Sequence, residues 1–274
     1  MAKNASAIVL AGNGVNCEME TAHACKLGGF DTVDIVNVWE LLEGEVSLDS
    51  YDLLALPGGF LDGDDLGSAR AQANRLKKSM VNRTRQPVID QFIQHIKNGK
   101  LVIGICNGFQ LMVKLGLLPG FDNDYTTQKV TLTHNDSGRF EDRWVWLKAN
   151  EMSPCVFTRG IDRVYFPIRH GEGKFVTPST DVLDRLKENN QIVFNYVDAT
   201  SDTPTITYPE NPNGSQFAIA GICDPSGRVF GLMPHPEAYL HRTNHPRWTR
   251  EELPEEGMGL SLFKNACRYV LENK

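Results

Sequence analysis

A cysteine between two glycines is the residue of this sequence best suited to nucleophilic chemistry. Residues 104–108 read G-I-C-N-G, so Cys106 follows a short apolar run and precedes an amphipathic run that continues to Leu117. Small residues two positions before and after a nucleophile allow a sharp strand-to-helix turn without Cβ clashes. A thiol at that turn lies at a helix N-terminus, where free N–H groups and the helix dipole favour the thiolate. The alternative is a buried structural cysteine that follows a core strand.

A cysteine nucleophile needs a base and a group that orients the base. Among seven histidines, His235 is the best placed, because it follows an apolar run and lies between Pro234 and Pro236. Glu237 comes two residues later, and residues two apart in an extended segment point to the same side. The Glu237 carboxylate can therefore fix the tautomer of His235, although a histidine near a glutamate is more often a surface pair.

Two further glycine-containing segments could line the same site. His170 begins a His-Gly-Glu-Gly stretch after another apolar run, and its glycines permit close approach of the backbone to a ligand. The loop 57–67 follows a buried run and lacks the Lys and Ser/Thr of a Walker loop. It is either a plain connection or a loop whose Gly58-Gly59 segment exposes a backbone N–H to a reacting oxygen.

A third glycine pair, Gly12 and Gly14, resembles the start of a dinucleotide-binding pattern. The third glycine of that pattern would fall at position 17, which is a cysteine. We therefore expect no nucleotide cofactor in this chain.

The composition is typical of a soluble globular protein, with 41% hydrophobic and 23% charged residues. The net charge of −6 argues against a nucleic acid or an anionic membrane as the main partner. No apolar run approaches the ~20 residues of a membrane span, and the run 7–11 is too short for a signal peptide. The six cysteines form no C-x-x-C pair, so we expect no disulfide framework, no metal site and a reducing cytoplasm.

The elements that position these residues alternate between strand and helix over the first 117 residues. The apolar runs predict strands at 6–10, 32–38, 53–56 and 101–105, and helical spacing predicts helices at 16–27, 39–42, 68–82, 87–98 and 109–117. Short apolar strands of this kind belong to a parallel sheet that is covered on both faces. Ligands bind at the carboxyl ends of such strands. We therefore expect residues 12–16, residues 57–60 and Cys106 to meet at one edge.

The second half of the chain predicts a partly antiparallel arrangement. Strands are expected at 129–134, 143–147, 163–169 and 191–197, a hairpin at 217–224 and 228–233, and helices at 178–188 and 259–271. The segment 202–215 is rich in Pro, Asn and Gly and predicts a loop. No repeat or linker interrupts the chain, so residues 1–274 are predicted to form one domain.

Three separated motifs resemble the class I (triad) glutamine amidotransferases. They are Gly-Ile-Cys-Asn-Gly-Phe-Gln at 104–110, Pro-Gly-Gly-Phe at 57–60 and Met-Pro-His-Pro-Glu at 233–237, in the order of that family. Further stretches resemble the glutaminase subunits of phosphoribosylformylglycinamidine synthase, namely 16–18, 63–67, 170–175, 212–215 and 220–222. The resemblance extends from about residue 6 to residue 237. It implies a three-layer α/β/α fold of flavodoxin-like type, with a mostly parallel central sheet.

The resemblance also implies a catalytic triad. Cys106 would attack the side-chain amide carbon of glutamine and form a glutamyl thioester. His235, held by Glu237, would deprotonate the thiol and protonate the departing ammonia. The backbone N–H groups of Gly59 and Asn107 would form the oxyanion hole.

The same resemblance assigns contacts with bound glutamine to four residues. Gln110 lies one helical turn after the nucleophile, Phe60 follows the glycine pair, and the backbone of His170 and Gly171 would line the pocket. Ammonia would pass to a synthetase subunit that converts formylglycinamide ribonucleotide to the amidine with ATP and magnesium. A small accessory subunit is also expected, and no cofactor is expected in this chain.

The sequence departs from the family at its C-terminal end. The family usually has arginine after His-Pro-Glu, whereas Ala238 stands here. The polar segment 239–257 is longer than in short bacterial subunits and contains Trp248 among several basic residues. This excursion is either a docking surface or a solvated loop.

Two alternative functions remain open at this point. One keeps the glutaminase chemistry but supplies another acceptor, as in pyrimidine, tryptophan or cofactor synthesis. The other is a regulatory relative that binds glutamine without turnover, although the presence of Cys106, His235 and Glu237 argues against it.

Overall fold

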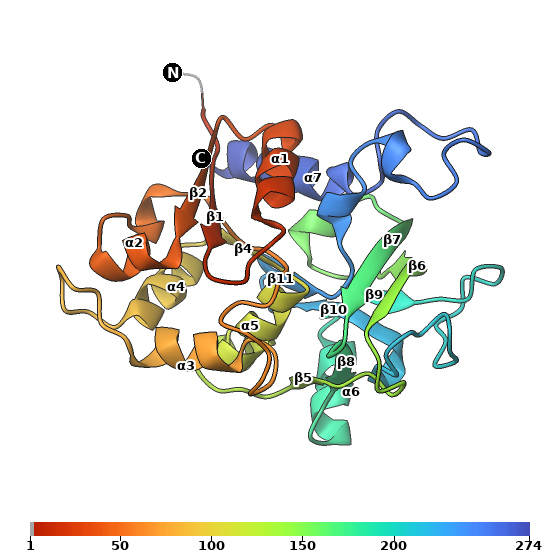
Figure 1. The fold of residues 1–274 in the computed structure, drawn as a ribbon, viewed down its shortest axis with the longest axis horizontal. Coiled ribbons are helices and arrows are strands. Elements are labelled where there is room, and N and C mark those ends of the chain that lie inside the picture. The colour runs from red at the N-terminus through yellow and green to blue at the C-terminus, as the bar shows by residue number, and fades with distance from the viewer. Residues whose placement is uncertain (1–2) are drawn as a thin grey trace.

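A nine-stranded mixed sheet forms the centre of the computed structural model, which describes residues 3–274 (Figure 1). In spatial order, the strands are β2 (Thr32–Asn37), β1 (Ser6–Ala11), β3 (Leu53–Leu56), β4 (Leu101–Ile105), β11 (Val229–Leu232), β10 (Ile219–Cys223), β9 (Ile192–Tyr196), β6 (Glu141–Ala149) and β7 (Arg163–His170). The strands from β2 to β11 in this order are mutually parallel. The strands from β10 to β7 pair antiparallel.

The parallel half has the character that its sequence predicts. Every residue of β3, β4 and β11 is buried, as expected for short apolar strands that are covered on both faces. The predicted hairpin is also present, because β10 and β11 pair antiparallel. The α/β prediction is confirmed, with the antiparallel strands gathered in one half of the sheet.

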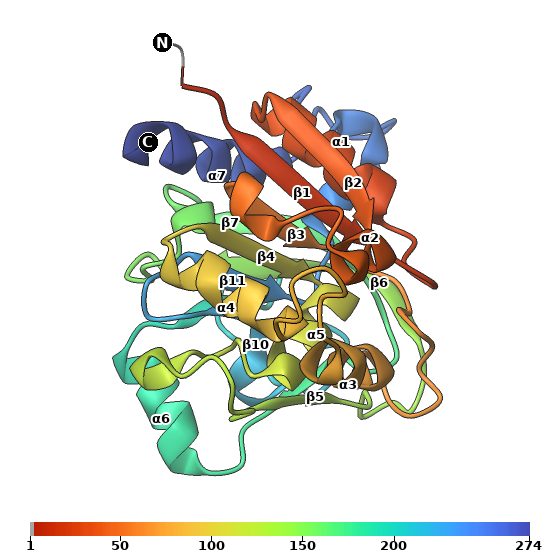
Figure 2. The ribbon, with the colours of Figure 1, turned by 90° about the vertical axis from the view of Figure 1, so that its left-hand side faces the viewer.

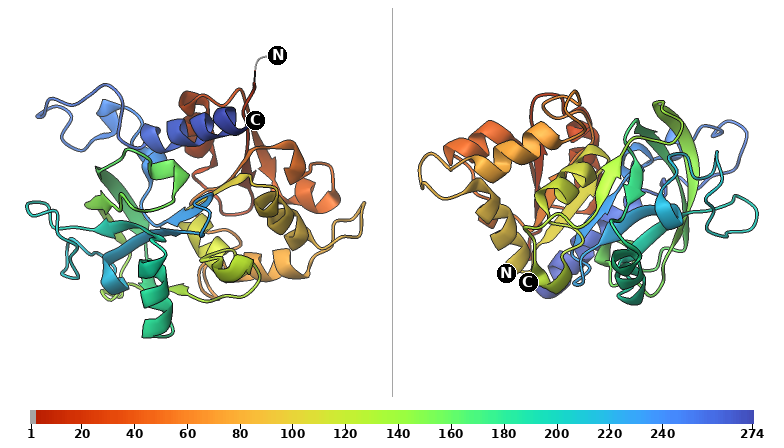
Figure 3. Two further views of the ribbon diagram at one scale, coloured as in Figure 1. Left: turned by 180° about the vertical axis from the view of Figure 1, so that it is seen from behind. Right: turned by 90° about the horizontal axis from the view of Figure 1, so that it is seen from below.

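Helices cover both faces of the sheet. They are α1 (Glu18–Gly28), α2 (Val38–Glu43), α3 (Arg70–Lys78), α4 (Val88–Lys97), α5 (Asn107–Leu115), α6 (Thr180–Glu188) and α7 (Leu260–Asn273). Figures 2 and 3 show α1 and α7 together on one face, with α3, α4 and α5 on the other. No helix within residues 3–274 is long and apolar enough to cross a bilayer.

Single turns of 3-10 helix connect several of these elements. They are Leu48–Ser50, Phe121–Asn123, Val156–Thr158, Gln216–Ala218, Pro236–Ala238 and Arg242–Asn244. The turn Pro236–Ala238 directly follows His235 and carries Glu237.

Three expectations about these elements need correction. Helix α1 begins at Glu18 rather than at residue 16, because the N–H groups of Asn16 and Cys17 donate to the Gly58 carbonyl. Helix α3 is shorter than the predicted 68–82, since Ala69 has a left-handed backbone (φ 59°) and Ser79 is extended. The strand expected at 129–134 is β5 (Thr131–Thr133), which pairs outside the main sheet with β8 (Lys174–Val176), a strand that was not predicted.

The polar excursion 239–257 is an ordered loop with a closed base. His241 pairs with Glu256 in an isolated bridge, and the N–H of Gly257 donates to the Leu240 carbonyl at 2.9 Å. His245 is buried against the rings of three aromatic residues, Trp144, Tyr165 and Tyr239. Apolar packing at one histidine thus anchors a segment that is otherwise polar.

Close packing of α5 on β3 leads to a stability prediction. A Cβ on Gly108 would overlap the Leu56 carbonyl oxygen, which belongs to fixed backbone. Gly108→Ala should therefore destabilise the chain by about 2 kcal/mol, because overpacking exceeds the gain in helix propensity. Urea unfolding of the variant would measure this loss. Gly171→Ala is the control, since nothing lies within 4 Å of its Cβ position; equal midpoints for the two variants would contradict the prediction.

Candidate active site

Cys106 lies at a strained turn between β4 and α5. Its backbone has φ 51° and ψ −105°, outside the regions that non-glycine residues normally occupy. A Cβ on Gly104 would overlap Met112 Sδ, just as one on Gly108 would overlap β3. The two glycines that flank Cys106 are therefore required by the close packing of this turn, as the sequence pattern predicts.

His235 and Glu237 follow β11, the strand that lies directly beside β4. Leu232 is in register with Ile105, so the two strands deliver the imidazole and the thiol to the same edge. Nδ1 of His235 and Oε1 of Glu237 are 2.5 Å apart, and both side chains are buried. A second contact fixes the backbone here, since the N–H of His235 donates to the Pro167 carbonyl at 2.9 Å.

The electrostatics of this pair favour the imidazolium. Burial alone would lower the pKa of His235, but the Glu237 carboxylate and then the Cys106 thiol outweigh it. The pKa of His235 is therefore raised well above its ordinary value. A cationic imidazole beside a cysteine stabilises the thiolate, which is the reactive form.

The thiol and the base lie close together, although they are not hydrogen-bonded in this conformation. Cys106 Sγ donates to the Arg169 carbonyl at 3.6 Å. Nε2 of His235 has no hydrogen-bond partner within residues 3–274. Catalytic hydrogen bonds are often open before substrate binds, and rotation about the Cα–Cβ bond of Cys106 would turn the thiol from Arg169 toward Nε2.

The two backbone N–H groups that the resemblance assigns to the oxyanion hole, those of Gly59 and Asn107, have no partner within residues 3–274. Gly59 has φ 142°, and a Cβ there would lie 2.6 Å from the Gly14 carbonyl oxygen. The adjacent N–H of Phe60 donates to that same oxygen at 2.7 Å. The Gly12–Gly14 turn therefore holds the loop that carries Gly59.

The Asn107 side chain joins this loop to α5. Its Oδ1 accepts a hydrogen bond from the N–H of Leu61 at 3.2 Å. Asn107→Ala keeps the backbone N–H of residue 107 but removes this link, so Gly59 should lose its position. We expect the rate constant for glutamine hydrolysis to fall by about tenfold to a hundredfold, measured as glutamate release. Alkylation of Cys106 by iodoacetamide should keep its rate; a parallel fall in both rates would contradict a role confined to the oxyanion loop.

Comparison with known proteins places the chain in a family. Residues 4–270 match the CobB/CobQ-like glutamine amidotransferase domain. The chain is 45% identical to the phosphoribosylformylglycinamidine synthase subunit PurQ of Dehalococcoides mccartyi over 96% of both chains. It is 42% identical to the same subunit of Methanococcus maripaludis strain C7, again over 96% of both chains. The chain belongs to the PurQ family of glutamine amidotransferases. A solved structure, PurLQS from Thermotoga maritima, contains a chain with a TM-score of 0.69 and 29% identity, over 97% of this chain and 99% of that one.

The predicted glutamine contacts lie around one cavity of this PurQ-family chain. Phe60 and Gly171 line a cavity of about 370 Å³, together with Arg139 and two carboxylates, Asp64 and Glu172. Charged groups of both signs suit the α-ammonium and α-carboxylate of a free amino acid.

Gln110 and His170 support this cavity through hydrogen bonds. Gln110 Nε2 donates to the Glu172 carbonyl at 2.7 Å, while its Oε1 accepts from Asn107. The His170 ring is buried against Asn135, and burial lowers the pKa of His170 to about 3, so the ring is neutral. The imidazole of His170 is therefore a structural group, and the contact of its backbone with glutamine stays a prediction.

Cys17 is the residue that sequence reasoning missed. It has no flanking glycines of the kind that surround Cys106, yet its thiol lies beside His235 and Glu237. One signal was available, since residues 12–16 were expected at this edge and Cys17 is the next residue. Burial raises the pKa of the Cys17 thiol, although its interaction with His235 acts in the opposite direction.

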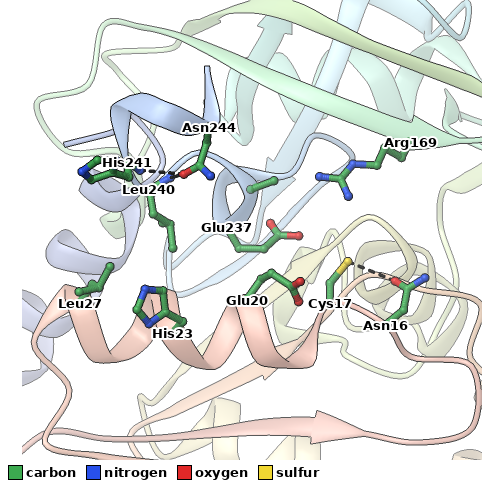
Figure 4. A pocket seen from close by; sticks show the side chains of 11 residues that line it. Asn16, Cys17, Glu20, His23, Leu27, Arg169, Glu237, Leu240, His241 and Asn244 are labelled. Carbon is green, nitrogen blue, oxygen red and sulfur yellow. Dashed lines mark hydrogen bonds between the residues drawn. The ribbon is translucent and has the colours of Figure 1, made fainter. Parts of the chain in front are cut away.

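Ala238, the position that departs from the family, lines a cavity that also borders Glu237 of the triad. This cavity has a volume of about 860 Å³ and also contains Cys17, Glu20, Arg169 and Glu237 (Figure 4). Figure 4 shows Arg169 directed toward Glu237 from β7. A guanidinium is thus present in the cavity even though residue 238 is alanine.

Proposed function

We propose that this chain is the glutaminase subunit of a phosphoribosylformylglycinamidine synthase. It would hydrolyse glutamine and pass ammonia to a synthetase subunit, which converts formylglycinamide ribonucleotide to formylglycinamidine ribonucleotide with ATP. The names of its PurQ relatives support the acceptor. The single observation that carries the chemistry is the delivery of Cys106 and the His235–Glu237 pair to one edge by two adjacent parallel strands.

The first half of the reaction forms a thioester. The Cys106 thiolate attacks the side-chain amide carbon of glutamine, and the carbonyl oxygen becomes an oxyanion that the N–H groups of Gly59 and Asn107 bind. Each such donor contributes on the order of 3 kcal/mol to the transition state. His235 gives its proton to the amide nitrogen, the C–N bond breaks and ammonia leaves.

The second half releases glutamate. His235, now neutral, takes a proton from water as the water oxygen attacks the thioester carbon. The C–S bond breaks, and Cys106 returns to its thiolate beside a protonated His235. Glu237 holds Nδ1 throughout, so that the other ring nitrogen exchanges the proton.

The partners of this chain follow from the same proposal. A synthetase subunit would hold ATP and magnesium, and a small accessory subunit would complete the complex, in keeping with the PurLQS assembly that contains the similar Thermotoga chain. The six cysteines are all free and buried, which suits a reducing cytoplasm.

Reconstitution with the synthetase subunit of the same organism tests this function. The pair, with glutamine, ATP and formylglycinamide ribonucleotide, should release glutamate and form the amidine in equal amounts. Glutamate release without amidine formation would indicate a different acceptor. Glutamine binding without any glutamate release would indicate a regulatory relative.

A further inference from the structure

We propose that Cys17, His235 and Glu237 form a binding site for a thiophilic divalent cation such as Zn²⁺. Its occupation would stop glutamine hydrolysis, a consequence that rests on the proposed function, whereas the binding itself does not. The site is separate from the glutamine cavity that Phe60 and Gly171 line.

The three side chains supply a ligand set that zinc uses. A thiol sulfur, an imidazole nitrogen and a carboxylate oxygen lie within 4.8 Å of one another, and all three residues are buried. Ligand atoms of a tetrahedral zinc site are about 3.5 Å apart, given Zn–S and Zn–N bonds of roughly 2.3 and 2.0 Å. Side-chain rotations that break the contact between Nδ1 of His235 and Oε1 of Glu237 would bring these atoms around one ion.

Two unpartnered polar atoms on the buried pair point to the same conclusion, because an ion could displace the Nε2 proton. Within residues 3–274, Nε2 of His235 and Oε2 of Glu237 have no hydrogen-bond partner. Buried polar atoms are normally paired. The Cys17 thiol donates to Asn16 Oδ1, at 3.2 Å, and would lose this proton on binding the ion.

The 860 Å³ cavity beside α1 gives the ion a route to these atoms. Cys17 and Glu237 form part of its wall, and Glu20 adds an exposed carboxylate that attracts cations (Figure 4). Arg169 lies in the same cavity and opposes a cation. The cavity thus carries two carboxylates, Glu20 and Glu237, besides Arg169 and the histidines His23 and His241.

Occupation of this site would remove the base from the reaction. A ring of His235 that is coordinated to the ion cannot exchange a proton with Cys106 or with the leaving nitrogen. Cys106 is outside the group of three ligands. The inhibition would therefore not require modification of the nucleophile, and a chelator should reverse it.

Cobalt binding tests the site without reference to activity. The full chain, stripped of metal and kept reduced with a phosphine, should show a near-ultraviolet thiolate-to-Co²⁺ band on titration, and Zn²⁺ should displace it. Cys17→Ser should lose the band and weaken Co²⁺ binding by at least the roughly hundredfold that loss of a supporting residue can cost. Cys106→Ser should keep the band. Loss of the band in Cys106→Ser but not in Cys17→Ser, or no band in the parent chain, would overturn the proposal.

A second measurement uses the unmodified chain, in case Cys17→Ser fails to fold. Zn²⁺ should slow iodoacetamide labelling of Cys17 by about tenfold or more, read by mass spectrometry, while Cys267 keeps its rate. Equal labelling of Cys17 with and without Zn²⁺ would refute the site. Cobalt binding without glutaminase activity would refute only the proposed function, and glutaminase activity without cobalt binding would refute only this inference.

Discussion

Replacing Cys106 by alanine should abolish glutamine-dependent synthesis while leaving ammonia-dependent synthesis by the assembled complex intact. Without the sulfur, no thioester can form. No oxyanion then develops for the oxyanion hole to stabilise. Loss of a nucleophile from a triad lowers the rate by about four to six orders of magnitude. Glutamate release and amidine formation, each measured with glutamine and then with ammonium salts, would give the result.

A matched control separates this effect from a change in the core. Cys155 is another buried free cysteine, and it lies outside the active site, so Cys155→Ala should retain glutamine-dependent activity. If Cys106→Ala kept glutamine-dependent activity, the assignment of the nucleophile would be wrong. If it also lost ammonia-dependent synthesis, the variant would have damaged assembly rather than chemistry.

Glu237→Gln should lower the rate constant for glutamine hydrolysis by about three to four orders of magnitude. An amide at this position can leave the histidine in the wrong tautomer, and in a serine-type triad the equivalent change has an effect of about that size. The Glu237 carboxylate also opposes the effect of burial on the pKa of His235. Its removal should therefore lower that pKa, so that the imidazolium is lost at lower pH.

The pH profile of kcat/KM measures this second effect. Its alkaline limb should move to lower pH in Glu237→Gln, because the protonated imidazole is the form that gives a proton to the leaving amide nitrogen. Glu20→Gln is the control. Glu20 lines the 860 Å³ cavity together with Glu237, but its side chain is exposed and it is far from His235 in the sequence. An alkaline limb that moved to higher pH, or equal losses in both variants, would contradict the role of Glu237.

The parts of the site that follow local rules could be predicted from the sequence. The glycines at 104 and 108 are needed because their Cβ atoms would clash with Met112 and β3, and the spacing of glycines around a nucleophile at a tight turn is visible in the sequence. The parallel sheet then places strand ends at one edge, which is why Cys106 and His235 follow neighbouring strands that are in register.

The parts that depend on tertiary contacts could not be predicted. Strand β8 is three residues long and forms only through its pairing with β5. The burial of His245 depends on aromatic rings from β6 and β7. No pattern in the polar segment 239–257 predicts this burial. Cys17 lies beside His235 because its N–H donates to the Gly58 carbonyl, so that α1 begins only at the next residue, Glu18.

The pairing of β4 with β11 has a consequence for how the enzyme regains activity after denaturation. The two strands are far apart along the chain, and their register alone places the thiol beside its base. Parallel pairing over such a separation forms slowly, because closure of the intervening loop costs entropy before any contact forms. Glutaminase activity should therefore return later than far-ultraviolet circular dichroism during refolding, which makes turnover a sensitive kinetic probe of native sheet assembly.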